Sequence, residues 1–442
     1  LCSSAASDVY KRQNNNIETK VIYFIMQLRP HQQRAFNAMQ ETPYGQVIIP
    51  TGGGKTYIMI ADAMKQFQLP RSQTIVVVAP RILLANQLCA EFTEFITEQN
   101  SKFGLDIAHV HSGETHHFST TNQFELNEWV NNSTKNIIIF TTYHSLHKVC
   151  NAVDVEVDTI YYDEAHNGTS KNFFEAVARM SFGIAYRRFA FTATPKLGRG
   201  ASKTRGMNNS KVWGNTLCNV KAQELIDTGA ILPPKVVPFE CKTERNKENA
   251  HEVDAQNLMD MLTSFGDNGH KVLVASPSTR VLNNMLSRTF ILDWLYDNGY
   301  DVLHITSKYG AIINGKKVGR EEFFDTLTKF GNDNNRKVIV FHYSILSEGI
   351  NVNGLTHTIL LRNLPTIEMA QTIGRVIRVH KDDRDAISNG QLTIGNWQFY
   401  KKSSGQITVP TENKYGDKIA RRLESIVDYI FKEGLPPIAY AS

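Results

Sequence analysis

Nearly continuous apolar runs rich in Val and Ile alternate along the chain with longer amphipathic stretches. Runs of this kind are typical of strands buried on both faces of a parallel sheet, and the stretches between them have the length of helices. We therefore predict βαβ units and an α/β fold. The predicted strands of a first series lie at 46–50, 74–80, 136–140, 159–164 and 188–195, and those of a second series lie at 271–277, 301–306, 337–344 and 357–364.

A basic stretch containing Gly and Asn, followed by the proline-containing segment LPPKVVPF, separates the two series. At 442 residues the chain is also too long for one ordinary hydrophobic core. We predict two α/β domains, over residues 26–236 and 237–442, with the boundary in the proline-containing segment. Residues 1–25 are expected to lie outside both domains, because LCSSAASDVYKRQ looks like translated linker sequence; Met26 is the hypothetical native start.

The composition, 41% hydrophobic and 21% charged, is typical of a globular protein, and no run of eighteen apolar residues predicts a membrane span. The five cysteines lie far apart and form no CxxC pair, which argues against zinc and against a disulfide framework. We therefore expect a reducing, intracellular compartment. The net charge of +5 permits a polyanionic partner such as nucleic acid.

The segment PTGGGKT, residues 50–56, follows a predicted strand and precedes a helical stretch. Glycines there let backbone N–H groups approach phosphates, and the N-terminus of the following helix favours negative charge. Lys55 can reach the β- and γ-phosphates, and the Thr56 hydroxyl can hold Mg²⁺. Ile49 stands where the usual phosphate-loop pattern has glycine. The predicted phosphate-binding residues are Thr51, Gly52, Gly53, Gly54, Lys55 and Thr56.

TIYYDEAH puts Asp163 and Glu164 at the carboxyl end of a predicted strand. In open parallel sheets, this edge is where ligands bind. An aspartate at that point can hold Mg²⁺, and a neighbouring glutamate can orient and deprotonate a water that attacks the γ-phosphate. We predict these two roles for Asp163 and Glu164.

With PTGGGKT, DEAH, TATP and QTIGRVIR in this order, the sequence resembles superfamily 2 helicases and translocases. It looks most similar to the DEAH-type group that includes the phage UvsW helicase, RadD, RecG and the motor subunits of type III restriction enzymes. The resemblance extends from Met26 to about His380. It implies two tandem RecA-like domains with parallel sheets and an ATP cleft between them, the cofactors ATP and Mg²⁺, and the cytoplasm of a bacterial or phage-infected cell.

The resemblance also assigns residues of the ATP site. Arg29 and Gln32 in LRPHQ would contact the base, and Gly349 and Asn351 in SEGIN would contact the nucleotide, although Asn351 stands where aspartate is common. Thr56 and Asp163 would hold Mg²⁺. The implied catalytic residues are Lys55, Asp163, Glu164, Gln371, Arg375 and Arg378.

A second set of residues is expected to contact nucleic acid or to couple it to the ATP site. Phosphate contacts supply most of a sequence-independent grip on nucleic acid. His166, Thr192 and Thr194 would link the ATP site to the strand-binding surface. The expected nucleic-acid contacts are Arg81, Thr141, Thr142, Ser276 and Ser344.

Three further patterns leave alternatives open. The basic stretch 195–211 is either a loop that leans on duplex DNA or a solvated insertion. The histidines of HVHSGETHH lack an evident closing ligand set, so a metal site is the less favoured interpretation. The C-terminal stretch GDKIARRLESIVDYIFKEG has Ile419, Leu423, Val427 and Ile430 at helical spacing, and core packing is favoured over partner binding.

The two arginines of QTIGRVIR suggest how the domains work together. An arginine finger contributes about 10³- to 10⁵-fold to the rate of phosphoryl transfer. If the second domain supplies Arg375 and Arg378, they reach the phosphates only when the domains close on ATP, so turnover becomes movement along nucleic acid. We expect an ATP-dependent DNA helicase or double-strand translocase that acts on branched or duplex DNA in recombination, replication or repair. The alternatives are a restriction motor subunit and an ATP-gated nucleic-acid clamp.

Overall fold

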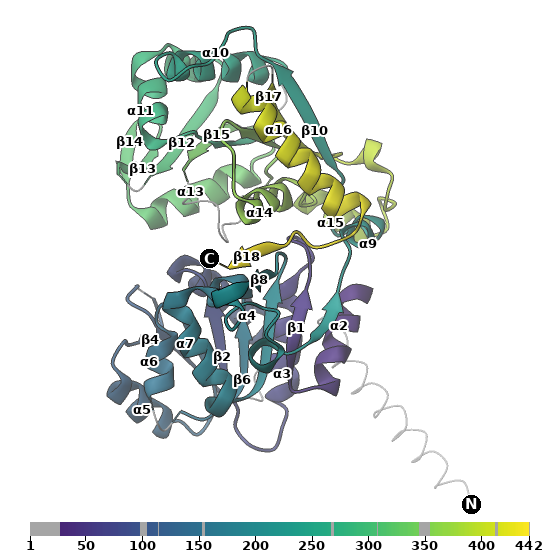
Figure 1. Ribbon diagram of the computed structural model, residues 1–442. Coiled ribbons are helices and arrows are strands. Elements are labelled where there is room, and N and C mark those ends of the chain that lie inside the picture. The colour runs from purple at the N-terminus through teal and green to yellow at the C-terminus, as the bar shows by residue number, and fades with distance from the viewer. Residues whose placement is uncertain are drawn as a thin grey trace, which may run out of the picture.

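The computed structural model describes residues 27–97, 104–113, 115–152, 155–266, 269–306, 308–343, 354–411 and 414–441. Two β-sheets follow one another along the chain, and helices cover the faces of each (Figure 1). The predicted fold class, tandem α/β domains, is confirmed. The limits of the two domains at residues 236 and 237 stay a prediction, and the second sheet begins at Pro234.

Neighbouring strands of the first sheet pair in parallel. Both faces are buried, so successive residues of a strand enter different cores: Ile75 and Val77 on one side, Val76 and Val78 on the other. Every position of such a strand must therefore be apolar, which explains the continuous runs in the sequence. In spatial order the strands are β4 (Phe118–Ser119), β3 (Leu105–Val110), β5 (Asn136–Thr142), β2 (Thr74–Ala79), β6 (Val157–Tyr162), β7 (Ala185–Thr192), β1 (Tyr44–Ile48) and β9 (Thr216–Asn219).

Helix α3 of the first domain packs against both α2 and α4, and α6 packs against α7. The helices that follow β1 and β2 thus begin at the carboxyl edge of the sheet, where a ligand is expected. The helical segments are α2 (Pro30–Glu41), α3 (Lys55–Gln66), α4 (Ile82–Thr97), α5 (Gln123–Asn131), α6 (Leu146–Asn151), η1 (Ala165–Thr169), α7 (Lys171–Arg179), η2 (Met180–Ile184), η3 (Gly200–Ser202), α8 (Ser210–Trp213) and α9 (Ala222–Asp227).

The second sheet is parallel from β10 to β12 and ends in an antiparallel hairpin, β13 and β14. The hairpin extends the prediction, which contained only parallel strands. In spatial order the strands are β10 (Pro234–Glu240), β17 (Gly405–Thr411), β16 (His357–Leu360), β11 (Lys271–Ala275), β15 (Lys337–His342), β12 (Tyr300–Thr306), β13 (Gly310–Ile313) and β14 (Lys316–Val318).

The C-terminal helix α16 packs on β17 of this sheet, and Ile419 and Leu423 are completely buried in the core. The favoured interpretation of the amphipathic C-terminal stretch, core packing, is therefore confirmed. The helical segments of the second domain are α10 (Ala250–Thr263), α11 (Thr279–Arg288), α12 (Ile291–Asp297), α13 (Arg320–Asn332), α14 (Thr366–Val376), α15 (Lys381–Ser388), η4 (Trp397–Phe399), α16 (Lys414–Val427) and η5 (Asp428–Lys432).

After η5 the chain returns to the first domain and forms β18 (Ala439–Ala441), the yellow arrow beside β8 (Lys196–Gly198) in Figure 1. We call residues 433–441 the C-terminal strap. The two short strands pair in parallel, and the Ala439 N–H donates to the Pro195 carbonyl at 3.1 Å. The Ser202 hydroxyl donates to the Ala441 carbonyl at 2.8 Å. The strap therefore joins the second domain to the segment directly after β7.

The basic stretch 195–211 is folded, through β8, η3 and α8. Arg205 donates to the Thr169 carbonyl at 2.9 Å, and the guanidinium of Arg199 lies 3.5 Å from the centre of the Tyr440 ring. Two of its cations thus make contacts within the protein. These contacts favour a structural role for the stretch over a loop that leans on duplex DNA.

Candidate active site

The segment between β1 and α3 folds as a phosphate-binding loop. Gly52 and Gly54 have φ angles of 91° and 76°, which side chains with a Cβ rarely adopt. A Cβ at Gly53 would lie 2.3 Å from Cγ2 of Ile49, so this position also needs glycine. The loop delivers the chain to the N-terminus of α3, where Lys55 and Thr56 occupy the first turn and backbone N–H groups favour an anion.

Residues at the start of α2 support this loop through hydrogen bonds. The Gln32 amide donates to the carbonyls of Gly53 and Gly54 at 3.3 and 3.2 Å, and its oxygen accepts from the Arg29 N–H at 2.9 Å. His31 was not identified from the sequence, yet its Nε2 lies 2.9 Å from the Gly53 carbonyl. Because a carbonyl only accepts, Nε2 carries the proton, and burial lowers the pKa of His31 so that the ring stays neutral.

Asp163 and Glu164 follow β6 directly, at the carboxyl edge of the sheet. Lys55 Nζ lies 3.6 Å from Glu164 Oε1. Glu164 has a left-handed backbone (φ 44°), a strained conformation for a residue with a side chain. The Tyr143 hydroxyl donates to the Asp163 carbonyl at 2.8 Å. The chain therefore turns sharply at Glu164 and directs its carboxylate toward the phosphate loop.

The two carboxylates differ in their ionisation. Burial, and then the negative charge of Glu164, raise the pKa of Asp163. Burial would also raise the pKa of Glu164, but Lys55 and, after it, His166 and Arg375 lower it below its usual value. Glu164 is thus held as a carboxylate, the form that accepts a proton, whereas the protonated form of Asp163 is favoured until a cation lies beside it.

His166 connects Glu164 to the segment after β7. Its Nε2 accepts from the Asn167 amide at 3.3 Å, so Nδ1 carries the proton and donates to the Thr192 hydroxyl at 3.0 Å. Nδ1 also lies 3.5 Å from Glu164 Oε2. The Thr192 hydroxyl accepts in turn from the Thr194 N–H at 3.1 Å. The structure thus brings together the three residues predicted to couple the sites.

Helix α14 of the second domain touches the phosphate loop. A Cβ at Gly374 would lie 2.3 Å from Cβ of Thr51, so only glycine permits this approach. Arg375 is buried, and its positive charge reaches both Glu164 and His342. Arg378 lies beyond the end of the helix; its Cγ would be 3.9 Å from a Cβ at Gly52. Both predicted arginines therefore lie at the phosphate loop of the first domain.

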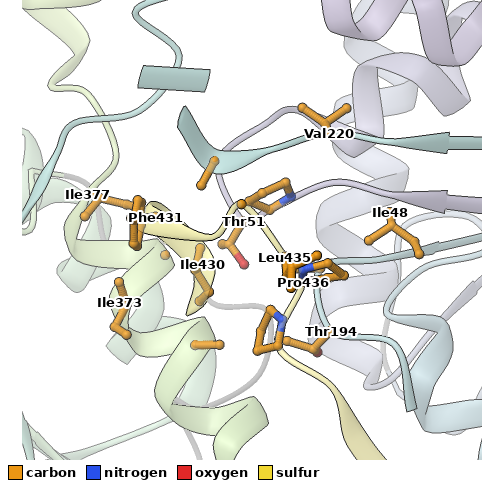
Figure 2. A pocket seen from close by; sticks show the side chains of 17 residues that line it. Ile48, Thr51, Thr194, Val220, Ile373, Ile377, Ile430, Phe431, Leu435 and Pro436 are labelled. Carbon is orange, nitrogen blue, oxygen red and sulfur yellow. The ribbon is translucent and has the colours of Figure 1, made fainter. Parts of the chain in front are cut away.

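An apolar pocket of about 30 Å³ lies between the domains, beside the phosphate loop (Figure 2). This volume accommodates about two water molecules, so the pocket is not the nucleotide site. The C-terminal strap closes one side of it. Its labelled lining residues are Ile48, Thr51, Thr194 and Val220 of the first domain and Ile373, Ile377, Ile430, Phe431, Leu435 and Pro436 of the second.

Glu91 on α4 is a further residue at the cleft that the sequence did not reveal. Burial raises the pKa of this carboxyl, while a hydrogen bond to the Thr56 side chain and the charge of Arg378 act in the opposite direction. Glu91 thus contacts the predicted Mg²⁺ ligand Thr56 and lies close to Arg378. A glutamate within a helix carries no sequence signal for such a position.

The residues predicted to contact nucleic acid differ in accessibility. Arg81 is exposed at the start of α4. Thr141 is completely buried and donates to the Val110 carbonyl at 2.8 Å, and Ser276 is also completely buried. The Thr142 hydroxyl accepts from the Ser145 N–H at 3.2 Å. In this structure a phosphate cannot reach the hydroxyls of Thr141 and Ser276, and these contacts stay predictions.

Ser344, Gly349 and Asn351 lie outside the described residues, as does the predicted start at Met26. Gln371 is buried on α14, one turn before Arg375. Within the described residues, no set of three or more His, Cys, Asp or Glu side chains is arranged to hold a metal ion. His109 Nδ1 and His111 Nε2 instead lie 2.9 Å apart as a hydrogen-bonded pair.

Two family models match the chain, one for each domain. The model described as the res subunit of type III restriction enzymes matches residues 25–197, and the helicase conserved C-terminal domain matches residues 254–380. Residues 25–197 and 254–380 are therefore similar to domains of type III restriction enzymes and of helicases, respectively. The finer DEAH-type grouping with UvsW, RadD and RecG stays a prediction. No curated protein matches this sequence.

Solved structures share the fold of these two domains at low identity. The type ISP restriction-modification enzyme LlaBIII, bound to DNA, has a TM-score of 0.66 and 16% identity over 94% of this chain and 31% of its own. A putative HsdR subunit of a type I restriction enzyme from Vibrio vulnificus YJ016 gives 0.59 and 17%, over 93% and 67%. Dbp5 from S. cerevisiae, bound to RNA and ADP BeF3, gives 0.56 and 15%, over 93% and 89%.

This chain thus spans about a third of the length of the LlaBIII chain. The Dbp5 match, by contrast, covers most of both chains. Both likenesses support the predicted RecA-like fold of each domain. In the part of the chain that the structure describes, none of the helices combines the length and apolar character required to cross a bilayer.

Proposed function

We propose that this protein is an ATP-dependent DNA helicase or double-strand DNA translocase. The observation that carries the proposal is the approach of two domains to one phosphate loop: Arg378 lies beside Gly52, and the charge of Arg375 reaches Glu164. Phosphoryl transfer is accelerated by positive charge placed around the γ-phosphate. Because the arginines belong to the second domain, they can accelerate hydrolysis only when the two domains are closed.

The residues of the cleft fit ATP and Mg²⁺. The positive-φ glycines and the N-terminus of α3 provide backbone N–H groups for phosphates. Glu164 Oε2 is buried, and the described residues supply no hydrogen-bond donor for it. Thr56 and Asp163 would hold Mg²⁺, which supplies positive charge between the β- and γ-phosphates when bound. Arg29 and Gln32 would lie on the base side, where Gln32 already supports the loop.

The side chains of the cleft would then have separate roles in hydrolysis. Lys55 and the two arginines would neutralise charge on the γ-phosphate, and Glu164 would orient the attacking water and accept its proton. His166, Thr192 and Thr194 would transmit the state of Glu164 to the surface after β7. Gln371, Gly349 and Asn351 would complete the contacts from the second domain.

The nucleic-acid partner is proposed to be branched or duplex DNA, held through its backbone. Exposed Arg81 at the edge of the first sheet supports this, as does the likeness to an enzyme solved in complex with DNA. A sequence-independent grip of this kind weakens as salt is raised. The protein would act in recombination, replication or repair, within the cytoplasm, and its function would resemble that of the UvsW, RadD and RecG group.

ATP hydrolysis measured with no nucleic acid, single-stranded DNA, duplex DNA, forked DNA and RNA tests this proposal. We expect strong stimulation by DNA in the wild-type protein and its loss in Lys55→Ala. Lys65→Ala is the matched control, because Lys65 is exposed in the last turn of the same helix. Equal hydrolysis in all five conditions, or a fully active Lys55→Ala protein, would refute the proposal.

A motor subunit of a restriction complex is the second candidate, favoured by the family model that matches residues 25–197 and by the restriction enzymes among the similar structures. A motor of this class moves along duplex DNA without separating its strands. Displacement of a third strand from a triplex, without unwinding of a fork, would favour it. Fork unwinding would favour the helicase, and stimulated hydrolysis without either movement would favour an ATP-gated clamp.

A further inference from the structure

The backbone of Arg378 is held from two sides, because this residue lies beyond the last turn of α14. On one side it forms an isolated bridge with Ile231 in the segment between the domains, and the Leu232 N–H donates to the Ile377 carbonyl at 2.7 Å. On the other side Lys402 Nζ donates to the Arg378 carbonyl at 2.8 Å. The direction of the guanidinium thus depends on contacts outside its own helix.

Lys402 is itself held in place by α15. It is only 5% exposed, and Asp383 on α15 is 2% exposed. The two oxygens of Asp383 accept from the backbone N–H groups of Lys401 and Lys402, at 2.9 and 3.2 Å. One buried carboxylate therefore fixes the backbone from which Lys402 extends toward Arg378.

Burying a lysine at this point is unfavourable, because the positive charge of Arg378 acts on it more strongly than the negative charge of Asp383. Burial, and then the charge of Arg378, lower the pKa of Lys402 to about 7, and only Asp383 acts against them. His357 and His380 also lie within reach of its charge, and Lys402 lowers the pKa of each. An apolar side chain of the same length would avoid the cost of burying a charge. The contact with Arg378 is the feature that an apolar side chain would lose.

We propose that Lys402 is a positioning residue for Arg378, holding the carbonyl of this arginine so that its guanidinium stays at the phosphate loop. The proposal rests on the proposed ATP hydrolysis. Lys402 does not face the phosphate loop itself; it acts through the backbone behind the arginine. Its loss should therefore slow the chemical step without weakening the binding of ATP.

Kinetics of the full 442-residue chain with saturating duplex DNA test this role. Lys402→Met keeps the length of the side chain and removes the donor. We expect kcat to fall about 10- to 100-fold, the effect of a small misplacement of a catalytic group, with KM for ATP changed less than about threefold. Lys401→Met is the matched control: Lys401 is the adjacent residue, its side chain is 55% exposed, and it pairs with Asp382. It should leave kcat unchanged.

A double-mutant cycle separates positioning from a general structural effect. If Lys402 acts only through Arg378, the Lys402→Met change should have almost no effect on kcat in an Arg378→Ala background. A merely structural role would slow both backgrounds equally and lower the melting temperature. Should Lys402→Met not fold, Lys402→Leu, which also lacks the donor, takes its place in the cycle.

The outcomes distinguish the two proposals. Wild-type kcat in Lys402→Met, or an equal loss in the Arg378→Ala background, overturns the positioning role and leaves the proposed function intact. A wild-type protein without DNA-stimulated hydrolysis, or an Arg378→Ala protein with full activity, refutes the use of this arginine in hydrolysis and the positioning role with it.

Discussion

Gly374 offers the sharpest test of domain closure, because it is the point at which α14 meets the phosphate loop. A Cβ at this position would lie 2.3 Å from Cβ and 2.8 Å from Cγ2 of Thr51, whereas ordinary contact begins at about 3.4 Å. Gly374→Ala must therefore move the two surfaces apart by about 1 Å, the difference between 2.3 and 3.4 Å. Arg375, the next residue in the helix, moves with the same surface.

A displacement of about 1 Å in a catalytic group costs about 100-fold in rate. Alanine also favours a helix interior over glycine by about 1 kcal/mol, so α14 itself should not be weakened. We expect Gly374→Ala to lower DNA-stimulated kcat about 100-fold, with little change in the affinity for a fluorescent ATP analogue. Gly183→Ala is the matched control, because a Cβ at Gly183 would meet nothing within 4 Å.

Thr51→Gly removes all three atoms that an alanine at position 374 would strike. This change has its own cost in the phosphate loop, so the informative quantity is the effect of Gly374→Ala in each background. The loss of kcat caused by Gly374→Ala should be large when residue 51 is threonine and small when it is glycine. An equal loss in both backgrounds, or full activity of Gly374→Ala, would show that closure of this contact does not limit hydrolysis.

Three other predictions concern the scaffold. Arg187→Met leaves the completely buried Asp62 without its two-fold partner, at 2.8 and 2.9 Å, and should lower the free energy of unfolding in urea by about 3–5 kcal/mol; a loss below 1 kcal/mol would contradict this. Tyr440→Ala removes the ring contact of the C-terminal strap and should speed hydrogen exchange in β8 and β18 but not in β1. Burial lowers the pKa of His109 and His342 to about 3, below the unfolded value of about 6.5. Their folded forms stay neutral, so stability should fall as pH drops from 6.5, by about 1.4 kcal/mol per pH unit for each, and a urea midpoint unchanged between pH 7 and 5 would refute this.

The sequence predicted those elements whose environment leaves a simple pattern. The strand expected at 74–80 is β2 (Thr74–Ala79), because burial on both faces requires an apolar residue at every position. Asp163 and Glu164 were expected at a strand end for the same reason, since two acidic residues cannot continue such a run. The glycines at 52–54 predict a loop conformation that other residues rarely adopt, and Lys55 directly after them indicates that the loop binds phosphate.

Other elements escaped because their patterns are mixed. β10 contains Pro234 and Pro238 and reads as a linker, yet it is the edge strand of its sheet, where proline is tolerated. β3 contains Asp106 and His109 among its apolar residues, which obscures a strand. Some contacts join two polar residues that lie far apart in the sequence, for example Glu91 with Thr56 and Lys402 with Arg378. Neither the spacing of residues nor their hydropathy indicates such contacts.

The C-terminal strap changes how opening of the cleft has to occur. The path from Glu164 through His166 and Thr192 to Thr194 ends at Pro195, whose carbonyl accepts from Ala439 of the strap. The second domain is therefore connected to the region of Glu164 twice: by α14 on the phosphate loop and by β18 on the segment after β7. A motion that withdraws α14 must either unpair β18 from β8 or turn about that pairing. The strap adds to the short β18–β8 pairing the bond of Ser202 to Ala441 and the apolar contacts of Leu435 and Pro436. Helix α14 packs mainly on β16, β17 and α16 of its own domain and meets the phosphate loop at Gly374. Opening of the cleft therefore has to disrupt the strap as well as the contact of Gly374 with Thr51.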